Sequence, residues 1–417
     1  MKRINSVSLF LAALVALSAS SAHALTEMTG NTDGGAFFRI VVPDAWNGDL
    51  AIWNHGFSLS PIGPVSDLGP LVDVQLAEGY AVAASSYQQI GWAVFKTKND
   101  VQNLVNVFTT NFGAPNNVLL TGASLGGIVT TTIIEKAHIG NLTGAFTFCG
   151  AHAGSRNWDA SLDIRLIYDA ICSDVPGGSI PGGPTGLPAP GFPGFAFSQT
   201  DLAIAANTCT GILTPPIFRT GSQEVRLARF VAATQLPENF LLTDMGFATF
   251  GHSNLIFEPA KLAGKQGMGN DGVVYSPAVP ANIERVAAHP GGANRLSRNY
   301  TPTGDVGSVV HVALHTDKDG LVIVENESEY ASVVPASNFT VAVAIEAVPT
   351  HCGNTPAEIV ASWESLRGWA AGGQQPTAAS IQGFCQFIDA TNPLFPGPCR
   401  IDPDFVIPDM DGRVPPR

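Results

Sequence analysis

Three residues far apart in the sequence have the types and the order that acyl transfer through a serine needs. Ser124 lies in the segment Gly122-Ala-Ser-Leu-Gly126, which follows an apolar run. A serine nucleophile needs a base to accept its proton and a carboxylate to orient that base. Candidates for both roles lie downstream, at His351 and Asp319. The chemistry that this set predicts is nucleophilic attack on a carbonyl carbon.

The residues on either side of Ser124 give its G-x-S-x-G motif a structural context. Residues 118–121 predict a buried strand, and residues 128–138 predict a helix that ends near Gly140. A serine in the tight turn between strand and helix presents its hydroxyl above the sheet. The chain has 44 glycines, so such a motif can arise by chance, and residues 251–255 are a near match without a preceding strand. We interpret Ser124 as the nucleophile because both of its flanks fit.

His351 is the candidate base. It follows a predicted strand at residues 340–345 and precedes a helix that opens with the capping box Thr355-Pro-Ala-Glu358. A histidine at this strand end can reach a serine on a central strand. The other downstream histidines, which occupy no equivalent position, are His138, His152, His252, His289, His311 and His315.

The acid has two main candidates, Asp317 and Asp319, which both follow the predicted strand at residues 309–314. We favour Asp319 because Gly-Leu-Val follows it, so the chain turns there and continues as an apolar segment. Asp317 would then be a surface or loop-capping carboxylate. Asp305 precedes the strand and fits the role less well.

Two backbone N–H groups are expected to bind the oxyanion that forms during attack. One belongs to Leu125, directly after the serine, and the other to the loop His55-Gly56-Phe57, with Phe57 as the preferred donor. The alternative for this loop is an ordinary turn at the end of a strand. Tyr87 and Trp92 either line a substrate pocket or belong to the core.

The composition excludes several classes of function. The net charge of −13 and the lack of basic runs argue against nucleic acid and anionic membrane surfaces as partners.

A signal peptide is predicted over residues 1–24 from the segment Met1-Lys-Arg3, the apolar run at residues 7–17 and the Ala22-His-Ala24 site. No later stretch resembles a membrane helix. We expect a soluble protein that is secreted or periplasmic and carries no membrane anchor.

Six cysteines in an exported chain predict three disulfides, for which fifteen connectivities are possible. Closeness in sequence favours Cys385–Cys399 and Cys172–Cys209, which leaves Cys149 for Cys352. The alternative is that one or more remain free buried thiols. No cysteine or histidine spacing predicts a zinc site.

Strands and helices alternate in two parts of the chain and predict an α/β fold with a mostly parallel sheet. The first part covers residues 25–151, and the second covers residues 305–372. Residues 152–304 contain Pro/Gly-rich stretches and short helical patterns, so we interpret them as a cap inserted over the active face. Residues 373–417 are expected to form a Pro-rich tail held by the last disulfide.

Within these parts the expected elements are as follows. The expected strands cover residues 35–43, 50–53, 80–84, 118–121, 144–149, 309–314 and 340–345, and the expected helices cover residues 71–78, a segment capped by Asp100, 128–138, 159–171, 199–208, 224–235 and a final helix opened by residues 355–358.

These motifs together resemble the α/β-hydrolases, specifically a secreted serine hydrolase with a large cap. The residues that carry the resemblance are Asn54–Phe57, Ser85–Tyr87 with Gly91–Val94, Gly122–Gly127, Asp319–Val322 and His351–Gly353. The resemblance implies the α/β-hydrolase fold, a triad of Ser124, His351 and Asp319, and no cofactor. It does not extend over the cap.

The His351-Cys352 pair is also similar to the tannase and feruloyl esterase group. In that group a disulfide joins the residue before the nucleophile to the residue after the histidine. Here Ala123 precedes the serine, so that bridge cannot form as such, and Cys149 is the substitute partner for Cys352. This departure weakens the case for a phenolic ester as substrate.

The expected function is hydrolysis of a small-molecule or polymeric carboxylic ester through an acyl-enzyme. One alternative is a serine exopeptidase on the same scaffold, which would need an acidic cluster in the cap to hold a free amino group. The acidic residues of the cap are scattered in the sequence. The other alternative is a binding protein without catalysis, but such a protein usually lacks part of the triad.

Overall fold

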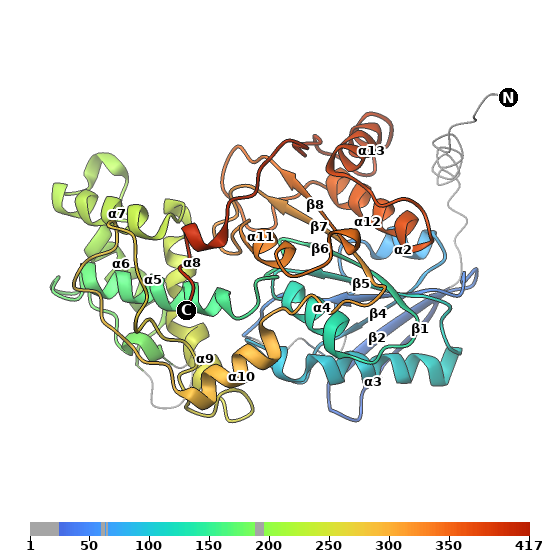
Figure 1. Ribbon diagram of the computed structural model, residues 1–417, viewed down its shortest axis with the longest axis horizontal. Helices are drawn as coiled ribbons and strands as arrows, with labels where there is room; N and C mark the ends of the chain where they lie inside the picture. Colours follow the sequence, from blue (N-terminus) through green and yellow to red (C-terminus); the bar gives the residue numbers. More distant parts are fainter. Residues whose placement is uncertain (1–24, 60–62, 64–65, 188–195) are drawn as a thin grey trace.

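The computed structural model describes residues 25–59, 63, 66–187 and 196–417. The predicted signal peptide and most of the Pro/Gly-rich stretch near residue 190 lie outside these residues. Figure 1 shows a sheet with helices on both faces in one half of the molecule and a separate group of helices in the other half.

Eight strands form one sheet in the order β1-β2-β4-β3-β5-β6-β7-β8. The strands are β1 (Leu25–Asn31), β2 (Phe37–Pro43), β3 (Leu50–Asn54), β4 (Ala81–Ser85), β5 (Val118–Ala123), β6 (Leu142–Phe148), β7 (Val310–Thr316) and β8 (Phe339–Ala344). β2 pairs antiparallel with β1 and β4, and the strands from β4 to β8 are parallel. The expected class, a mostly parallel α/β sheet, is confirmed.

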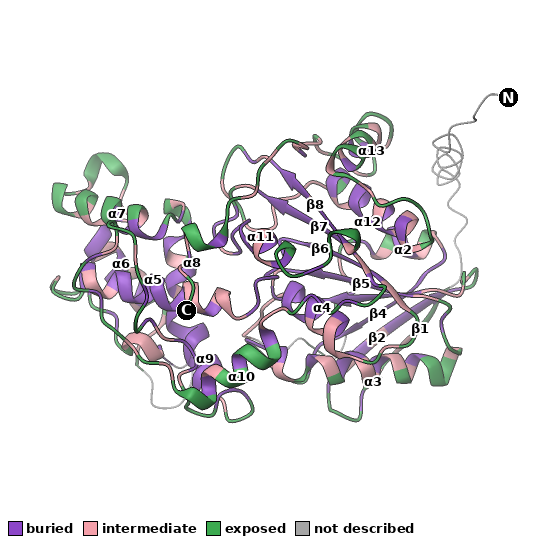
Figure 2. Ribbon diagram, viewed as in Figure 1, coloured by how far each residue is buried: buried purple, intermediate pink, exposed green. Residues whose placement is uncertain are grey.

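The central strands are apolar along their whole length because both faces of the sheet are covered. Every residue of β3, β4 and β5 is buried, as the purple strands in Figure 2 indicate. Successive residues face opposite ways, so Leu119 and Leu120 of β5 join different core clusters. The helices α3 (Val94–Phe112) and α4 (Leu125–Lys136) cover one face. The helices α2 (Val72–Ala77), α12 (Pro356–Ala370) and α13 (Ala378–Thr391) cover the other.

The helical half of the molecule is inserted between β6 and β7. Its helices are α5 (Arg156–Cys172), α6 (Gln199–Thr210), α7 (Gly221–Thr234), α8 (Leu241–Gly246), α9 (His252–Phe257) and α10 (Pro290–Tyr300). The first three correspond to the expected helical patterns, whereas α8, α9 and α10 were not expected. Ser253, in the near match to the serine motif, lies buried inside α9 and not in a strand–helix turn.

Several expected boundaries were wrong. Asp100 lies inside α3 and does not cap it, because its buried carboxylate accepts hydrogen bonds from the backbone and the side chain of Gln88 at 3.1 and 2.7 Å. α4 starts directly after Ser124 and ends before Gly140. The short helix α11 (Asn326–Ala331) and the edge strand β1 were not expected.

The C-terminal segment is also more regular than expected. It contains α13, which begins at a capping box of Thr377 and Ser380, so α12 is not the last helix. The prediction treated this segment as a tail because its prolines lie close to the helix on both sides.

The three expected disulfides are present: Cys149–Cys352, Cys172–Cys209 and Cys385–Cys399. They join residues that are 203, 37 and 14 positions apart. Among the residues that the structure describes, no helix combines the length and the apolar character needed to cross a membrane.

Gly126 allows α4 to start against the end of β3. A Cβ atom at this position would lie 2.1 Å from the carbonyl oxygen of Asn54, which belongs to the backbone and cannot move aside cheaply. We expect Gly126→Ala to lower the free energy of unfolding by about 1–3 kcal/mol, measured by chemical denaturation.

Gly383 is the matched control, because it is exposed in α13 and a Cβ atom there meets nothing within 4 Å. Gly383→Ala is expected to raise the free energy of unfolding by about 0.5–1 kcal/mol. Equal stability of the two variants would contradict the close packing described at Gly126.

Candidate active site

Ser124 occupies the turn between β5 and α4 in an unusual backbone conformation. Its φ and ψ are 56° and −122°, a region that residues with a side chain rarely adopt. Such a conformation costs about 1–3 kcal/mol and persists only where the surroundings enforce it. Gly122 and Gly126 provide those surroundings, because a Cβ atom on Gly122 would lie 2.7 Å from the carbonyl oxygen of Gly126.

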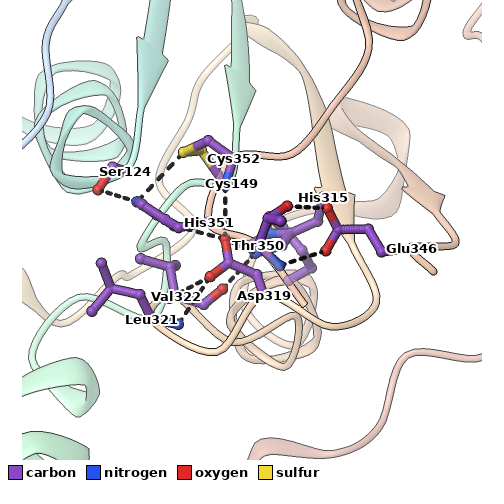
Figure 3. Close-up of a disulfide and its surroundings, with 11 residues drawn as sticks. Ser124, Cys149, His315, Asp319, Leu321, Val322, Glu346, Thr350, His351 and Cys352 are labelled. Atoms are coloured by element: carbon purple, nitrogen blue, oxygen red, sulfur yellow. Dashed lines mark hydrogen bonds and ion pairs between the residues drawn. A yellow bond between two sulfur atoms is a disulfide. The ribbon is translucent and has the colours of Figure 1, made fainter. Parts of the chain in front are cut away.

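The structure brings together the three residues expected to form a triad. Nε2 of His351 lies 2.9 Å from Oγ of Ser124, and Nδ1 of His351 lies 2.8 Å from Oδ2 of Asp319 (Figure 3). Ser124 follows β5, Asp319 follows β7 and His351 follows β8. They meet because the carboxyl ends of parallel strands lie at one edge of the sheet.

The carboxylate of Asp319 is held in a buried turn. Its Oδ1 accepts the N–H groups of Leu321 and Val322 at 3.0 Å each, and its Oδ2 accepts the N–H of Cys352 at 3.3 Å. The residue is 2 % exposed. These donors replace the water that an ionised carboxylate needs, and they orient its second oxygen toward His351.

Asp317 has a different partner. Its Oδ1 accepts the N–H of Glu346 at 2.7 Å, directly after β8. Asp317 therefore caps a loop, which is the role expected for whichever of the two aspartates does not contact the histidine. Of the two candidates, Asp319 is the one that contacts the histidine.

The loop that carries His351 is anchored on both sides. Cys352 forms the disulfide to Cys149 at the end of β6, and the side chain of Arg400 donates to the carbonyl of Gly353 at 2.7 Å. Thr350 donates its backbone N–H and its hydroxyl to the buried carboxylate of Glu346. These contacts fix the position of the imidazole relative to the sheet.

A sulfur atom also lies beside the imidazole. Sγ of Cys352 is 3.4 Å from Nε2 of His351, and Cys149, His351 and Cys352 lie close enough together to resemble a metal site. Both sulfurs are used in the disulfide, so neither offers the thiolate that a metal would bind.

The loop of residues 55–57 lies against the serine. A Cβ atom on Gly56 would be 3.5 Å from Cβ of Ser124. Nδ1 of His55 lies 2.7 Å from the carbonyl oxygen of Gly56. Because a carbonyl oxygen only accepts hydrogen bonds, this nitrogen carries the proton. Burial lowers the pKa of His55, so the ring is neutral at neutral pH. The expected oxyanion donors, Phe57 and Leu125, belong to residues that line one cavity with Ser124.

This cavity lies between the sheet half and the helical half. Its apolar lining residues include Phe57, Trp92, Ile164, Ile167, Leu236 and Phe247. Trp92 contacts Phe57 edge to face, with ring centroids 5.2 Å apart, and Phe247 contacts both rings. An apolar wall formed by two parts of the chain is typical of a pocket for an organic substrate.

Tyr87 does not belong to the lining of this cavity. Its ring stacks on His55 with centroids 4.0 Å apart, and its hydroxyl lies 3.4 Å from the carbonyl oxygen of His55. It therefore supports the loop of residues 55–57 from behind. Of the two aromatic residues expected at the substrate, we retain Trp92 alone.

Sequence reasoning missed the side of the cavity that the helical half and residues 411–415 provide. Phe247 and Val414 are among these lining residues, and no motif marks them. Arg417 holds the end of this segment against α5, with its guanidinium 3.1 Å from Asp159 and 2.7 Å from Asp163. Only the folded chain shows that these residues approach Ser124.

Comparison with known proteins gives distant similarities. No family model matches the chain. An o-phthalyl amidase of Xanthobacter agilis is 29% identical over 125 residues, which are 28% of this chain and 27% of that protein. The matched part thus spans about a quarter of the length of that curated relative.

Solved structures resemble the chain over most of its length at low similarity. Candida antarctica lipase A in its closed state has a TM-score of 0.42 and 10% identity, and covers 94% of this chain and 84% of its own. Feruloyl esterase B of Aspergillus oryzae has a TM-score of 0.40 and 12% identity, and the match covers 84% of this chain and 82% of the esterase. An esterase of Pyrococcus furiosus has a TM-score of 0.37 and 12% identity, and the match covers 85% of this chain and 93% of that esterase.

Of the three disulfides, the one beside His351 joins the two cysteines that are farthest apart in the sequence. We expect the double variant Cys149→Ser/Cys352→Ser to lose about 5 kcal/mol of unfolding free energy, because the crosslink restricts 203 residues of the unfolded chain. The control Cys385→Ser/Cys399→Ser opens a loop of 14 residues and is expected to lose about 3 kcal/mol. Chemical denaturation measures both, and the reverse order would contradict this account.

The assignment of the fold rests on the structure itself. The strand order, the antiparallel β2 and the turn from strand through serine to helix after β5 are those of the α/β-hydrolases. The chain has the α/β-hydrolase fold.

Proposed function

We propose that this protein is a hydrolase that cleaves carboxylic esters through an acyl-enzyme on Ser124. The observation that carries the proposal is the continuous hydrogen-bonded chain from Oγ of Ser124 through His351 to Asp319, with distances of 2.9 and 2.8 Å. Nucleophile, base and orienting acid are thereby within proton-transfer reach before any substrate binds.

The reaction follows from this arrangement. Oγ of Ser124 attacks the ester carbonyl carbon while Nε2 of His351 takes the hydroxyl proton. The tetrahedral intermediate expels the alcohol, which receives that proton from His351, and leaves the acyl group on Ser124. A water molecule then attacks the acyl carbon, gives a proton to His351 and releases the carboxylic acid as the serine regains its proton. Asp319 keeps the Nδ1 proton of His351 in place throughout.

The backbone around the serine supports an oxyanion hole. Because His55 binds the carbonyl oxygen of Gly56, the trans peptide that follows directs the N–H of Phe57 the opposite way. Leu125 is the first residue of α4, so its N–H belongs to the positive end of the helix dipole. We propose these two N–H groups as the donors to the developing oxyanion.

The cavity favours a substrate with an apolar acyl or alcohol part, because Trp92, Ile164 and Phe247 form its wall. The ester is thus a small molecule or a polymer segment with an apolar portion.

We propose no role for nucleic acid. The three disulfides agree with export to an oxidising compartment, which we propose as secretion or transfer to the periplasm.

The alternative of a serine exopeptidase needs free carboxylates for a substrate amino group. Asp159 and Asp163 of α5 do lie together, but both already bind Arg417. Burial, despite Arg417, raises the pKa of Asp159 to about 7, which further reduces the negative charge available for an amine. These contacts leave less negative charge on the two carboxylates for a free amino terminus.

We expect Ser124→Ala to abolish turnover of p-nitrophenyl esters while leaving the fold unchanged, because the Oγ nucleophile is lost. The control Ser253→Ala alters the near match to the motif inside α9 and is expected to retain activity.

A matched p-nitroanilide with the same acyl group separates esterase from amidase activity. Labelling by a fluorophosphonate separates an enzyme from a binding protein, and unchanged hydrolysis by Ser124→Ala would refute the proposal.

The two aspartates after β7 provide a second test. Asp319→Asn keeps the size of the side chain but removes the charge that holds the Nδ1 proton of His351, so kcat is expected to fall about 10³–10⁴-fold. Asp317→Asn alters the contact with Glu346 and removes a charge near Arg400, but it leaves the contact of Asp319 with His351 in place, so kcat is expected to stay within about 10-fold. Steady-state kinetics with one ester measures both, and equal losses would contradict the assignment of the acid.

A further inference from the structure

A fully buried cluster of polar side chains lies behind the turn that holds Asp319. His315 near the end of β7, Glu327 on α11 and His152 after β6 are all inaccessible to solvent or nearly so. Glu327 accepts from Nδ1 of His315 at 2.7 Å through one oxygen and from Nδ1 of His152 at 2.9 Å through the other. The proposed reaction uses none of these three residues directly.

The partners of His315 determine its protonation. Its Nε2 lies 2.7 Å from the carbonyl oxygen of Val322, which only accepts, so this nitrogen carries a proton. Although burial opposes ionisation, His152 and His315 lower the pKa of Glu327 to about 2, so Glu327 is a carboxylate. A carboxylate oxygen only accepts hydrogen bonds, so Nδ1 of His315 carries a proton as well and donates it in the hydrogen bond to Glu327. With both nitrogens protonated, His315 is an imidazolium.

The pKa of His315 agrees with this count of donors and acceptors. Burial alone would lower that pKa, but Glu327, Asp319 and the Val322 carbonyl together raise it above its usual value. A buried charge of this kind is tolerated because it is paired and each of its protons has an acceptor.

Val322 connects this imidazolium to Asp319. The carbonyl of Val322 accepts from His315, and the N–H of Val322 donates to Oδ1 of Asp319. Nε2 of His315 also lies 4.0 Å from Oδ2 of Asp319, the oxygen that binds His351 (Figure 3). The charge and the hydrogen bond thus act on the same turn.

We propose that His315, held as an imidazolium by Glu327, is a positioning residue that fixes the turn of residues 319–322 and so aims Asp319 at His351. Its charge also stabilises the buried carboxylate of Asp319. This inference rests on the proposed function, because it concerns the acid of the same triad.

Other titratable or charged groups face this site. They are Glu327 and His152 beside His315, and His351, Asp244 and Arg413 beside Asp319. Burial, opposed by Arg413 and reinforced by Asp319, raises the pKa of Asp244 well above its usual range. Arg413 is thus a second cation near Asp319, whereas His315 lies 4.0 Å from Oδ2 and also holds the turn through Val322.

Two amide substitutions at His315 separate positioning from packing. The amide nitrogen of glutamine takes the place of Nε2 and can still donate to Val322, whereas the shorter asparagine reaches only toward Glu327. We expect His315→Asn to lower kcat about 10–100-fold with little change in KM, because the acid is displaced. His315→Gln is expected to retain kcat within about 3-fold of the unchanged enzyme.

Both variants lose the same charge, so a purely structural role predicts equal losses of kcat and of thermal stability. His138 is exposed, and the control variants His138→Gln and His138→Asn are expected to be fully active. Activities are compared per folded active site, counted by fluorophosphonate titration. Equal kcat values for His315→Asn and His315→Gln would overturn the positioning role.

Glu327→Gln tests the charge while keeping the hydrogen bonds. The amide oxygen can accept from His152 and the amide nitrogen can donate to Nδ1 of a neutral His315, which still donates to Val322. Loss of the cation beside Asp319 reduces the repulsion of a protonated His351. We therefore expect the acid limb of the pH dependence of kcat/KM to move to higher pH by about 0.5–1 unit.

An unchanged acid limb in Glu327→Gln would show that His315 carries no catalytically relevant charge and would overturn that part of the proposal. Failure of this inference differs from failure of the proposed function. In the first case Ser124→Ala remains inactive while the His315 and Glu327 variants behave as wild type; in the second Ser124→Ala itself retains activity.

Discussion

The hydrogen bond between Nδ1 of His351 and the carboxylate of Asp319 is the contact on which the site depends. It joins two loops that follow different strands, and it sets the tautomer that leaves Nε2 free to face Ser124. A buried carboxylate keeps this role only if other donors solvate it. The turn of residues 319–322 and the N–H of Cys352 supply those donors.

A disulfide and strained backbone positions constrain the surroundings of this bond. The disulfide Cys149–Cys352 ties the histidine loop to β6, and Cys149, Cys352 and Ser124 all have positive φ angles. Strain at non-glycine residues clusters where a site requires a geometry that a relaxed chain would not adopt. The closely packed sheet and helices stabilise the fold enough to maintain these conformations.

The cavity beside Ser124 depends on a different constraint, the contact between the two halves of the molecule. Residues 411–415 run between the sheet half and the helical half and line the cavity. Arg413 contacts Glu325 at 3.6 Å on the sheet side, and Arg417 binds Asp163 on the helical side. A segment distant from Ser124 in sequence thus forms part of the cavity wall, so the shape of the cavity depends on the insertion and on this segment together.

The sequence by itself determined the α/β class and favoured the disulfides Cys172–Cys209 and Cys385–Cys399, because strand periodicity and short cysteine spacings are local properties. The glycines of the serine turn, also a local feature, singled out Ser124 as the candidate nucleophile. Chain order and the strand end favoured His351, and the turn that follows Asp319 favoured it over Asp317. Only the tertiary structure decided that Asp319 and not Asp317 meets the histidine, that Tyr87 lies behind the cavity, and that His315 and Glu327 are in hydrogen-bond contact in the core. These outcomes depend on where separate elements pack together, and such distances leave no periodic trace in the sequence.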